Sequence, residues 1–180
     1  PDHDPFFAEA NRLKMPIAVH FSLQFPVVDQ MFEHHFPNRV LAGIFPIMAG
    51  LTSLLCSGLL DRYKNLTFAF LEGGISWVPA HVERMDDHFA NPRYGAKDLI
   101  SHPPSDYLKS GRLFFGCEGN ESFLGRIVEE IGEDLFMFSS DYPHADRTEG
   151  TAKCLKERDD IPATVRAKLL EDNARGFYGF

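Results

Sequence analysis

The sequence predicts an α/β fold built on a parallel sheet, on the strength of two observations. Short apolar runs alternate with segments of helical periodicity along the 180 residues, which is the order that right-handed βαβ units produce. Each apolar run also ends at a polar side chain followed by loop residues, as strands do when they open at one rim of a sheet. With 44% hydrophobic and 24% charged residues, we expect a single globular domain over residues 1–180.

The first half of the chain supplies two predicted strands and a long helix between them. "PIAVH" (16–20) is a short apolar run that ends at His20, and "LTFAFLEGG" (66–74) ends at Glu72 and two glycines. Residues 40–60 carry no charge over a length that could cross a bilayer. Glycine, proline and serine lower the hydrophobicity of this segment, so we expect a helix covered by its own protein or by a second subunit.

A helix and a third strand follow. The spacing of apolar residues predicts a helix over 76–90, with Ser76 as its N-cap and Pro79 in its first turn. After a polar, proline-rich loop, "RLFFGCEGN" (112–120) predicts a third strand that ends at Glu118. The order strand, helix, strand again favours parallel pairing.

The last part of the chain continues the alternation. Residues 121–132 have helical period and stop at Gly132. "LFMF" (135–138) is a short apolar run bounded by Ser-Ser-Asp, which predicts a strand buried on both faces that opens into a loop at Asp141. A final helix is predicted within 161–179, where apolar residues recur at helical spacing.

Each of the four predicted strands ends at a polar candidate: His20, Glu72, Glu118 and Asp141. The carboxyl ends of parallel strands share one rim, so these side chains are expected to converge there. Closing a barrel takes about eight strands. The residues alone therefore leave two architectures open, a small doubly wound domain or half of a (β/α)₈ barrel whose first half lies before Pro1.

Composition excludes some function classes and indicates others. A formal net charge of -8 without clustered Lys or Arg excludes a phosphate-tracking surface, so we expect no nucleic-acid partner. Cys56, Cys117 and Cys154 lie far apart and in no Cys-x-x-Cys pattern, which favours a reducing cytoplasm. The chain begins at Pro1 with no methionine and no signal segment. We expect a natural start upstream and no membrane partner.

Six blocks along nearly the whole chain carry a family resemblance: "AVH" (18–20), "GLTSLLCSGLLDRYKNLTFAFLEGG" (50–74), "WVPAHVERMDDHF" (77–89), "PPSDYL" (103–108), "SSDYPH" (139–144) and "NARGFYG" (173–179). Together they resemble the amidohydrolase superfamily, in the amidohydrolase-related branch that also holds aminocarboxymuconate-semialdehyde decarboxylase-like enzymes. The Asp-Tyr-Pro-His block after an apolar strand and the downstream Asn-Ala-Arg helix are the most specific of the six.

The resemblance implies a (β/α)₈ barrel with a divalent metal at the carboxyl end of its strands, zinc with manganese as the alternative. His20 resembles the ligand from the fifth strand, and Asp141 resembles the ligand from the last. The family's first-strand His-x-His pair does not occur in these 180 residues. The resemblance therefore implies the C-terminal half of the barrel, strands five to eight with their helices. We expect this half alone to bind metal weakly and to have little or no activity.

We predict Asp141 and Glu72 as the catalytic residues. Asp141 can accept the proton of an attacking water, and Glu72 can act as a general acid or base. Glu72 stands where many relatives carry a histidine, and a structural ion pair with a buried arginine is its alternative role. Trp77, His144 and Glu118 are predicted to line the substrate pocket. Their alternatives are packing for Trp77, a loop position for His144 and structural hydrogen bonding for Glu118.

These residues predict a metal-dependent hydrolase that cleaves a C–O or C–N bond of a small molecule. The alternatives are a metal-dependent non-oxidative decarboxylase and a non-catalytic half-barrel that associates through open strand edges or the uncharged helix. We expect a homo-oligomer. Other polar residues are expected to be structural: His34, His35, His81, His88 and His102 at the surface, and Arg84 paired with Asp86 on one helix.

Overall fold

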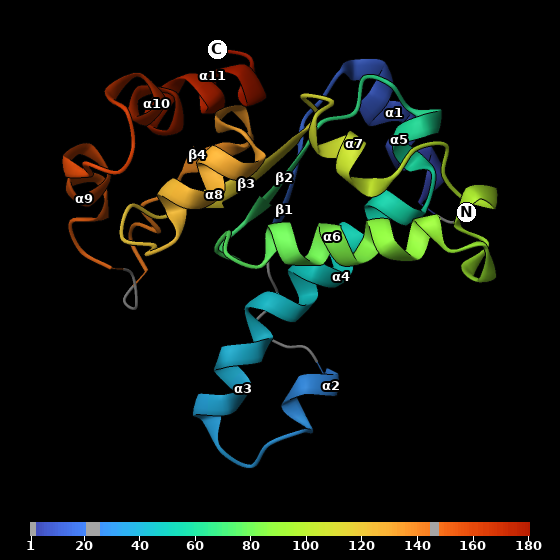
Figure 1. Cartoon of the computed structure of the whole chain (residues 1–180), viewed down its shortest axis with the longest axis horizontal. Coiled ribbons are helices and arrows are strands. Elements are labelled where there is room, and N and C mark those ends of the chain that lie inside the picture. Colours follow the sequence, from blue (N-terminus) through green and yellow to red (C-terminus); the bar gives the residue numbers. More distant parts are fainter. Residues whose placement is uncertain (1–2, 21–25, 145–147) are drawn as a thin grey trace.

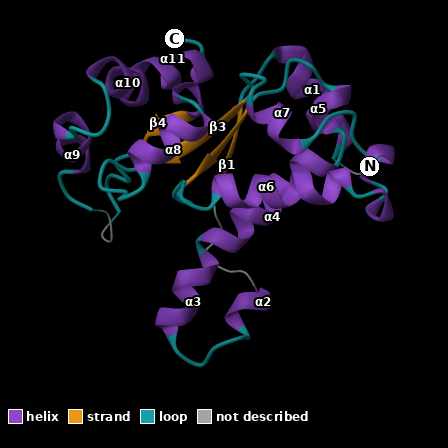
Figure 2. Ribbon diagram, viewed as in Figure 1, coloured by secondary structure: helices purple, strands orange, loops and turns teal. Residues whose placement is uncertain are grey.

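A computed structural model describes residues 3–20, 26–144 and 148–180 of the chain. Four strands, all parallel, form one sheet in the order β1-β2-β3-β4 (Figure 2). The strands are β1 (Ile17–His20), β2 (Phe68–Leu71), β3 (Leu113–Cys117) and β4 (Phe136–Phe138). The predicted α/β class, the parallel pairing and all four strands are thereby confirmed.

Helices connect the strands and flank the sheet (Figure 1). They are α1 (Asp4–Leu13) before β1; α2 (Pro26–Asp29), α3 (His35–Ala42), α4 (Ile44–Cys56) and α5 (Leu59–Arg62) between β1 and β2; α6 (Val78–Ala90), η1 (Pro92–Tyr94), η2 (Ala96–Asp98) and α7 (Pro104–Leu108) between β2 and β3; α8 (Leu124–Ile131) and η3 (Glu133–Leu135) between β3 and β4; and α9 (Thr151–Glu157), α10 (Ala163–Ala167), η4 (Lys168–Asp172) and α11 (Asn173–Tyr178) after β4.

The two faces of the sheet are covered unequally. On one face, aromatic side chains such as Phe70 and Phe115, whose ring centroids lie 5.8 Å apart, belong to the main core with the flanking helices. On the other face, Ala69 and Met137 form a smaller cluster with Phe177 of α11. His20, on β1, is exposed. A sheet with one helix-covered face and one partly open face is the wall of a barrel rather than a three-layer sandwich.

The helix predicted over 76–90 begins later than expected, so the predicted N-cap at Ser76 is wrong. The first helical residue is Val78 and Trp77 occupies the cap position. The glycine pair before it explains the shift, because Gly74 adopts φ 61°. The Trp77 indole also donates hydrogen bonds to the carbonyls of Gly73 and Gly74 at 3.0 and 2.9 Å. The turn therefore continues as far as Trp77, and the helix begins at the next residue.

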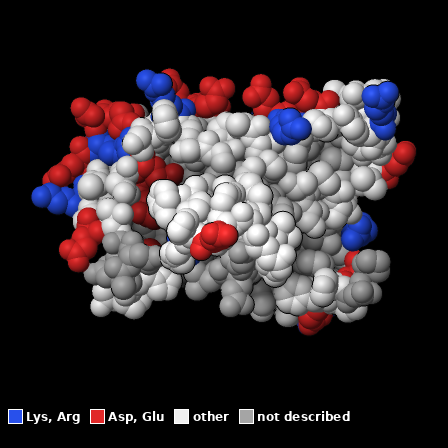
Figure 3. Space-filling view, turned by 90° about the horizontal axis from the view of Figure 1, so that it is seen from below, with Lys and Arg blue, Asp and Glu red and all other residues white. Residues whose placement is uncertain are grey.

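The helices that precede most of the uncharged segment form an arm that leaves the body of the molecule (Figure 1). Helices α2 and α3 extend away from the sheet, and α4 connects them to it (Figure 1). The helical stretch His35–Cys56 has a mean hydropathy of 1.7 and is long and apolar enough to cross a membrane, yet only 28% of its most apolar window is buried. Phe36 and Val40 on α3 are 79% and 51% exposed. Figure 3 views the molecule from below the orientation of Figure 1, the side toward which the arm extends. On this face the Lys, Arg, Asp and Glu side chains lie mostly at the margins (Figure 3).

We propose that the protein self-associates through this arm, with protein rather than lipid covering its apolar side chains. The double substitution Phe36→Asp and Val40→Asp is expected to shift the protein to monomer in sedimentation velocity, because it places two charges in the contact. Phe123→Asp, an exposed aromatic outside the arm, is expected to leave the distribution unchanged. A wild-type protein that stays monomeric at high concentration contradicts the proposal.

A buried amide ties the last helical stretch to the sheet. Asn173 is 8% exposed, and its Nδ2 donates to the carbonyls of Glu133 and Phe136, both at 2.8 Å. Asn173→Ala is expected to lower the free energy of unfolding by about 2 kcal/mol, since two buried carbonyls lose their donor. Urea denaturation measures this. The exposed Asn120→Ala should change it by no more than about 0.5 kcal/mol.

Candidate metal centre at the strand ends

Two acidic residues at the carboxyl ends of strands adopt an unusual backbone conformation with positive φ. Glu72 directly follows β2 with φ 60°, and Asp141 follows β4 with φ 52°. This left-handed region costs a non-glycine residue about 1 to 2 kcal/mol. The other such residue among the described ones, Lys14, ends a helix, where this conformation is common. Such conformations cluster at functional sites, and here they fall on the two predicted catalytic acids, whose roles stay predictions.

The side chains of these acids form a continuous set of contacts with two histidines. His20 Nε2 lies 3.0 Å from Glu72 Oε1. His144 Nδ1 lies 3.9 Å from the same oxygen and 2.5 Å from Asp141 Oδ1. One potential ligand atom from each of Glu72, Asp141 and His144 lies within 4.8 Å of the others. Residues from the ends of β1, β2 and β4 thus meet at one place.

The contacts suit a divalent cation. The Glu72 and Asp141 side chains are each only 18% exposed, whereas those of His20 and His144 are 50% and 57% exposed. Carboxylate and imidazole groups are the ligands that zinc and manganese accept. The predicted ligands His20 and Asp141 are connected through Glu72 and His144. Their role as ligands stays a prediction, and Glu72 and His144 join them as candidates.

Glu118, at the end of β3, lies in the same negatively charged surroundings. Burial raises the pKa of its carboxyl, and the neighbouring carboxylates of Glu121, Asp141 and Glu72 raise it further. Several carboxylates so close together repel one another unless a cation or protons offset their charge. A cation bound at the strand ends would offset this negative charge.

Glu121 was not predicted as part of the site, yet its carboxylate joins two of the loops. Oε1 accepts the backbone N–H of Glu118 and Oε2 accepts that of Ile75, both at 2.9 Å. The bond from Glu118 to Glu121 spans three residues, as in a capping box. This spacing is local, so it is visible in the sequence. The bond to Ile75 fixes the loop that carries Glu72.

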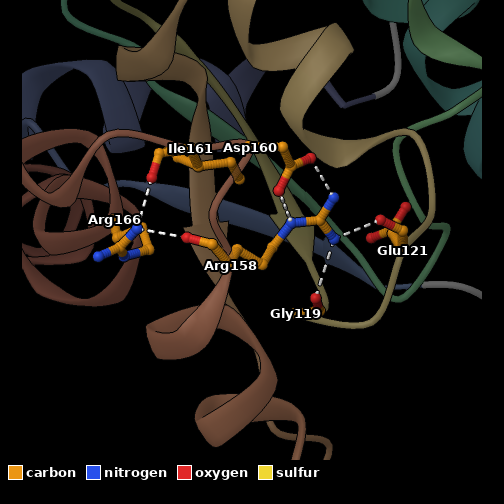
Figure 4. A network of polar contacts seen from close by, with 6 residues as sticks. All are labelled: Gly119, Glu121, Arg158, Asp160, Ile161 and Arg166. Atoms are coloured by element: carbon orange, nitrogen blue, oxygen red, sulfur yellow. Dashed lines mark hydrogen bonds and ion pairs between the residues drawn. The ribbon is translucent and has the colours of Figure 1, made fainter.

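A half-buried arginine contacts the loop after β3 from its other side (Figure 4). Arg158 Nη1 donates to the carbonyls of Gly119 and Glu121 at 3.1 and 2.7 Å. Its guanidinium is fixed in turn by a two-point pair with Asp160, at 2.8 and 2.6 Å. Arg166 donates to the carbonyls of Arg158 and Ile161. The chain after β4 therefore fixes the loop that carries Glu118 and Glu121.

Trp77 packs against the main core, close in sequence to the loop that carries Glu72. Besides its bonds to the two glycine carbonyls, its ring lies edge-on to Phe115 and His81, with centroids 6.2 and 5.7 Å away. These contacts match the packing role that was its alternative. Contact of Trp77 with substrate stays a prediction.

Two structural expectations are corrected. His81 is half-buried, with Nε2 2.8 Å from Thr52 Oγ1, and His88 is half-buried as well. The expected pair of Arg84 and Asp86 does not form among the described residues, because side chains two apart on a helix point in different directions. Asp86 instead accepts the backbone N–H of Ser105 at 3.0 Å. His34, His35 and His102 are exposed as predicted.

Comparison with known proteins places this geometry in context. The protein-family model described as Amidohydrolase matches residues 1–180. An amidohydrolase from Mycobacterium avium subsp. paratuberculosis K-10 superposes with a TM-score of 0.81 at 20% identity, over 99% of this chain and 45% of that one. The 5-carboxyvanillate decarboxylase of Sphingomonas paucimobilis gives 0.82 at 22% identity, over 100% and 54%.

A third solved structure, a dihydroxybenzoic acid decarboxylase from Polaromonas sp. JS666 with bound manganese, gives a TM-score of 0.76 at 23% identity, over 97% of this chain and 53% of that one. The chain thus spans about half the length of the solved structures it matches. Together with the helix-flanked parallel sheet, these matches confirm the fold of a partial (β/α)₈ barrel.

Glu121→Gln tests the connection between the two loops. The amide nitrogen of glutamine cannot accept, so one of the two hydrogen bonds is lost. We expect the backbone N–H of Ile75 or Glu118 to exchange with solvent about tenfold faster, measured by hydrogen–deuterium exchange. Glu129→Gln, an exposed change on α8, should leave both rates unchanged. Unaltered exchange at both positions in Glu121→Gln contradicts the assignment.

Proposed function

This chain belongs to the amidohydrolase family, and from that premise we propose that it is part of a metal-dependent hydrolase that cleaves a C–O or C–N bond of a small organic substrate with water. The observation that carries the proposal is the cluster of Glu72, Asp141 and His144, whose potential ligand atoms lie within 4.8 Å of one another. We propose a cytoplasmic location, because the cysteines are unpaired.

The residues at the strand ends fit a divalent cation, which we propose to be zinc, with manganese as the alternative. His20 and Asp141 would hold it, with Glu72 and His144 beside them. Such a cation supplies Lewis acidity and lowers the pKa of water toward neutrality. The manganese bound to the decarboxylase from Polaromonas supports a divalent ion in a protein of this fold.

Protons can be moved by the side chains themselves. Asp141 can accept the proton of the attacking water, and its Oδ1 contacts His144 Nδ1 at 2.5 Å, so the imidazole can relay that proton toward solvent. Glu72 can serve the leaving group as general acid or base. Burial and the neighbouring carboxylates raise the pKa of Glu118, which lies beside these groups at the end of β3.

The choice of substrate class depends on Glu72 rather than on net charge, because a bound cation would offset the carboxylates of Glu72 and Asp141. A carboxylate at residue 72 offers no hydrogen-bond donor to a substrate carboxylate, which favours a neutral ester, lactone or amide. A non-oxidative decarboxylase is the second candidate, because two of the matched solved structures are decarboxylases. Glu72 stands against it where many relatives have a histidine, since an ionised carboxylate cannot donate to an oxyanion.

Products distinguish the two reactions. The protein expressed from its natural start is loaded with Zn²⁺ or Mn²⁺. It is incubated with neutral esters, lactones and amides and, separately, with aromatic carboxylates. We expect acid release from a neutral substrate in a pH-stat, without CO₂. Asp141→Asn should slow it by about a thousandfold, in the range that acid–base groups contribute.

Asp106→Asn, an exposed change on α7, serves as the control and should retain the wild-type rate. Release of CO₂ from an aromatic carboxylate, with no hydrolysis of any neutral substrate, overturns the hydrolase proposal in favour of the second candidate. Hydrolysis that survives both chelation and Asp141→Asn overturns the metal-dependent mechanism.

A further inference from the structure

An apolar cavity lies in the helix layer and shares no residue with the strand-end cluster. It has a volume of about 340 Å³ and is walled by α4, by one side of α6 and by the segment from 94 to 104. Met85 and Phe89 of α6 face Leu99 and Ile100 across it. Figure 1 shows α4 and α6 lying together on the same side of the sheet. Sites for small molecules start at about this size.

The charged side chain among the residues that line this cavity is a positive one. The chain has 26 acidic residues against 18 basic ones, yet the residues that line the cavity include Arg84 and no carboxylate. Among the described residues, no hydrogen bond or ion pair of the Arg84 guanidinium is found. Lys97 and Asp98 lie side by side on η2, with Lys97 Nζ 5.9 Å from the centre of the Phe89 ring, so Arg84 carries the charge argument.

The inner wall offers no second charged group. Burial lowers the pKa of His81 and so disfavours its charged form. Thr52 Oγ1 donates to the carbonyl of Met48 at 2.8 Å and lies 2.8 Å from His81 Nε2. The hydroxyl proton is committed to that carbonyl, so His81 Nε2 is the donor to Thr52. A ligand therefore meets apolar walls inside and positive charge at the mouth.

We propose that this cavity binds a small apolar carboxylate, with its hydrocarbon part between α4 and α6 and its carboxylate on the Arg84 guanidinium. Guanidinium and carboxylate groups form paired, charge-assisted hydrogen bonds. The aromatic and aliphatic walls bury the hydrocarbon part. This site is separate from the strand ends and does not depend on the proposed hydrolase activity.

Binding of octanoate, with octan-1-ol as the uncharged probe of the same length, tests the proposal. Isothermal titration of the natural protein is expected to show one saturable octanoate site that binds more tightly than the alcohol. Arg84→Gln should weaken octanoate about fivefold, the effect of an exposed ion pair, and leave octan-1-ol unchanged. Arg126→Gln, on exposed α8 surface, removes the same charge elsewhere and should change neither.

Ala96→Phe, which fills the cavity from η2, is expected to abolish saturable binding of both probes while the thermal midpoint shows a folded protein. The proposal is overturned by the absence of saturable octanoate binding, or by equal octanoate affinity in wild type and Arg84→Gln. Octanoate binding that is lost in Asp141→Asn and kept in Arg84→Gln places the probe at the strand ends and overturns it as well.

Discussion

The parallel register of four short strands is the constraint on which the candidate site depends. His20 pairs with Leu71, and Cys117 pairs with Phe138, so the strands reach the same edge together. Whatever residue follows each strand must then lie at that edge. A slip of one residue in a strand would turn all of its side chains to the opposite faces of the sheet and separate the cluster. The aromatic packing of the strands against the helices is what fixes the register, because one face is heavily buried.

The strand register brings the loops after the strands to one edge of the sheet. Hydrogen bonds from residues outside the sheet then fix the conformation of these loops. Glu121 bonds the loops after β2 and β3 to each other, and Arg158 bonds the second of them to the chain after β4. Gly119 belongs to this arrangement, because a Cβ there would lie 2.1 Å from the carbonyl oxygen of Thr151. The strained conformations of Glu72 and Asp141 persist in surroundings that are fixed on several sides.

Local pattern was enough to predict the strands, since each is a short apolar run between polar loops, and enough to nominate Glu72 and Asp141, since both follow such runs. Local pattern could not predict which residues far apart in the sequence form hydrogen bonds or pack together. The bond between Glu121 and Ile75 spans 46 residues, and the cavity beside Arg84 arises only when two helices pack. The expectation for Arg84 and Asp86 failed on helix geometry that the spacing could have supplied.

The central claim is that the strand ends form one cation site. A crystal of the natural protein grown with Mn²⁺, measured at a wavelength where manganese scatters anomalously, tests it most directly. The account predicts an anomalous peak in coordinating contact with Asp141 and His20, with Glu72 or His144 beside it. A well-ordered site with no peak there, or a peak whose ligands include neither Asp141 nor His20, would contradict it.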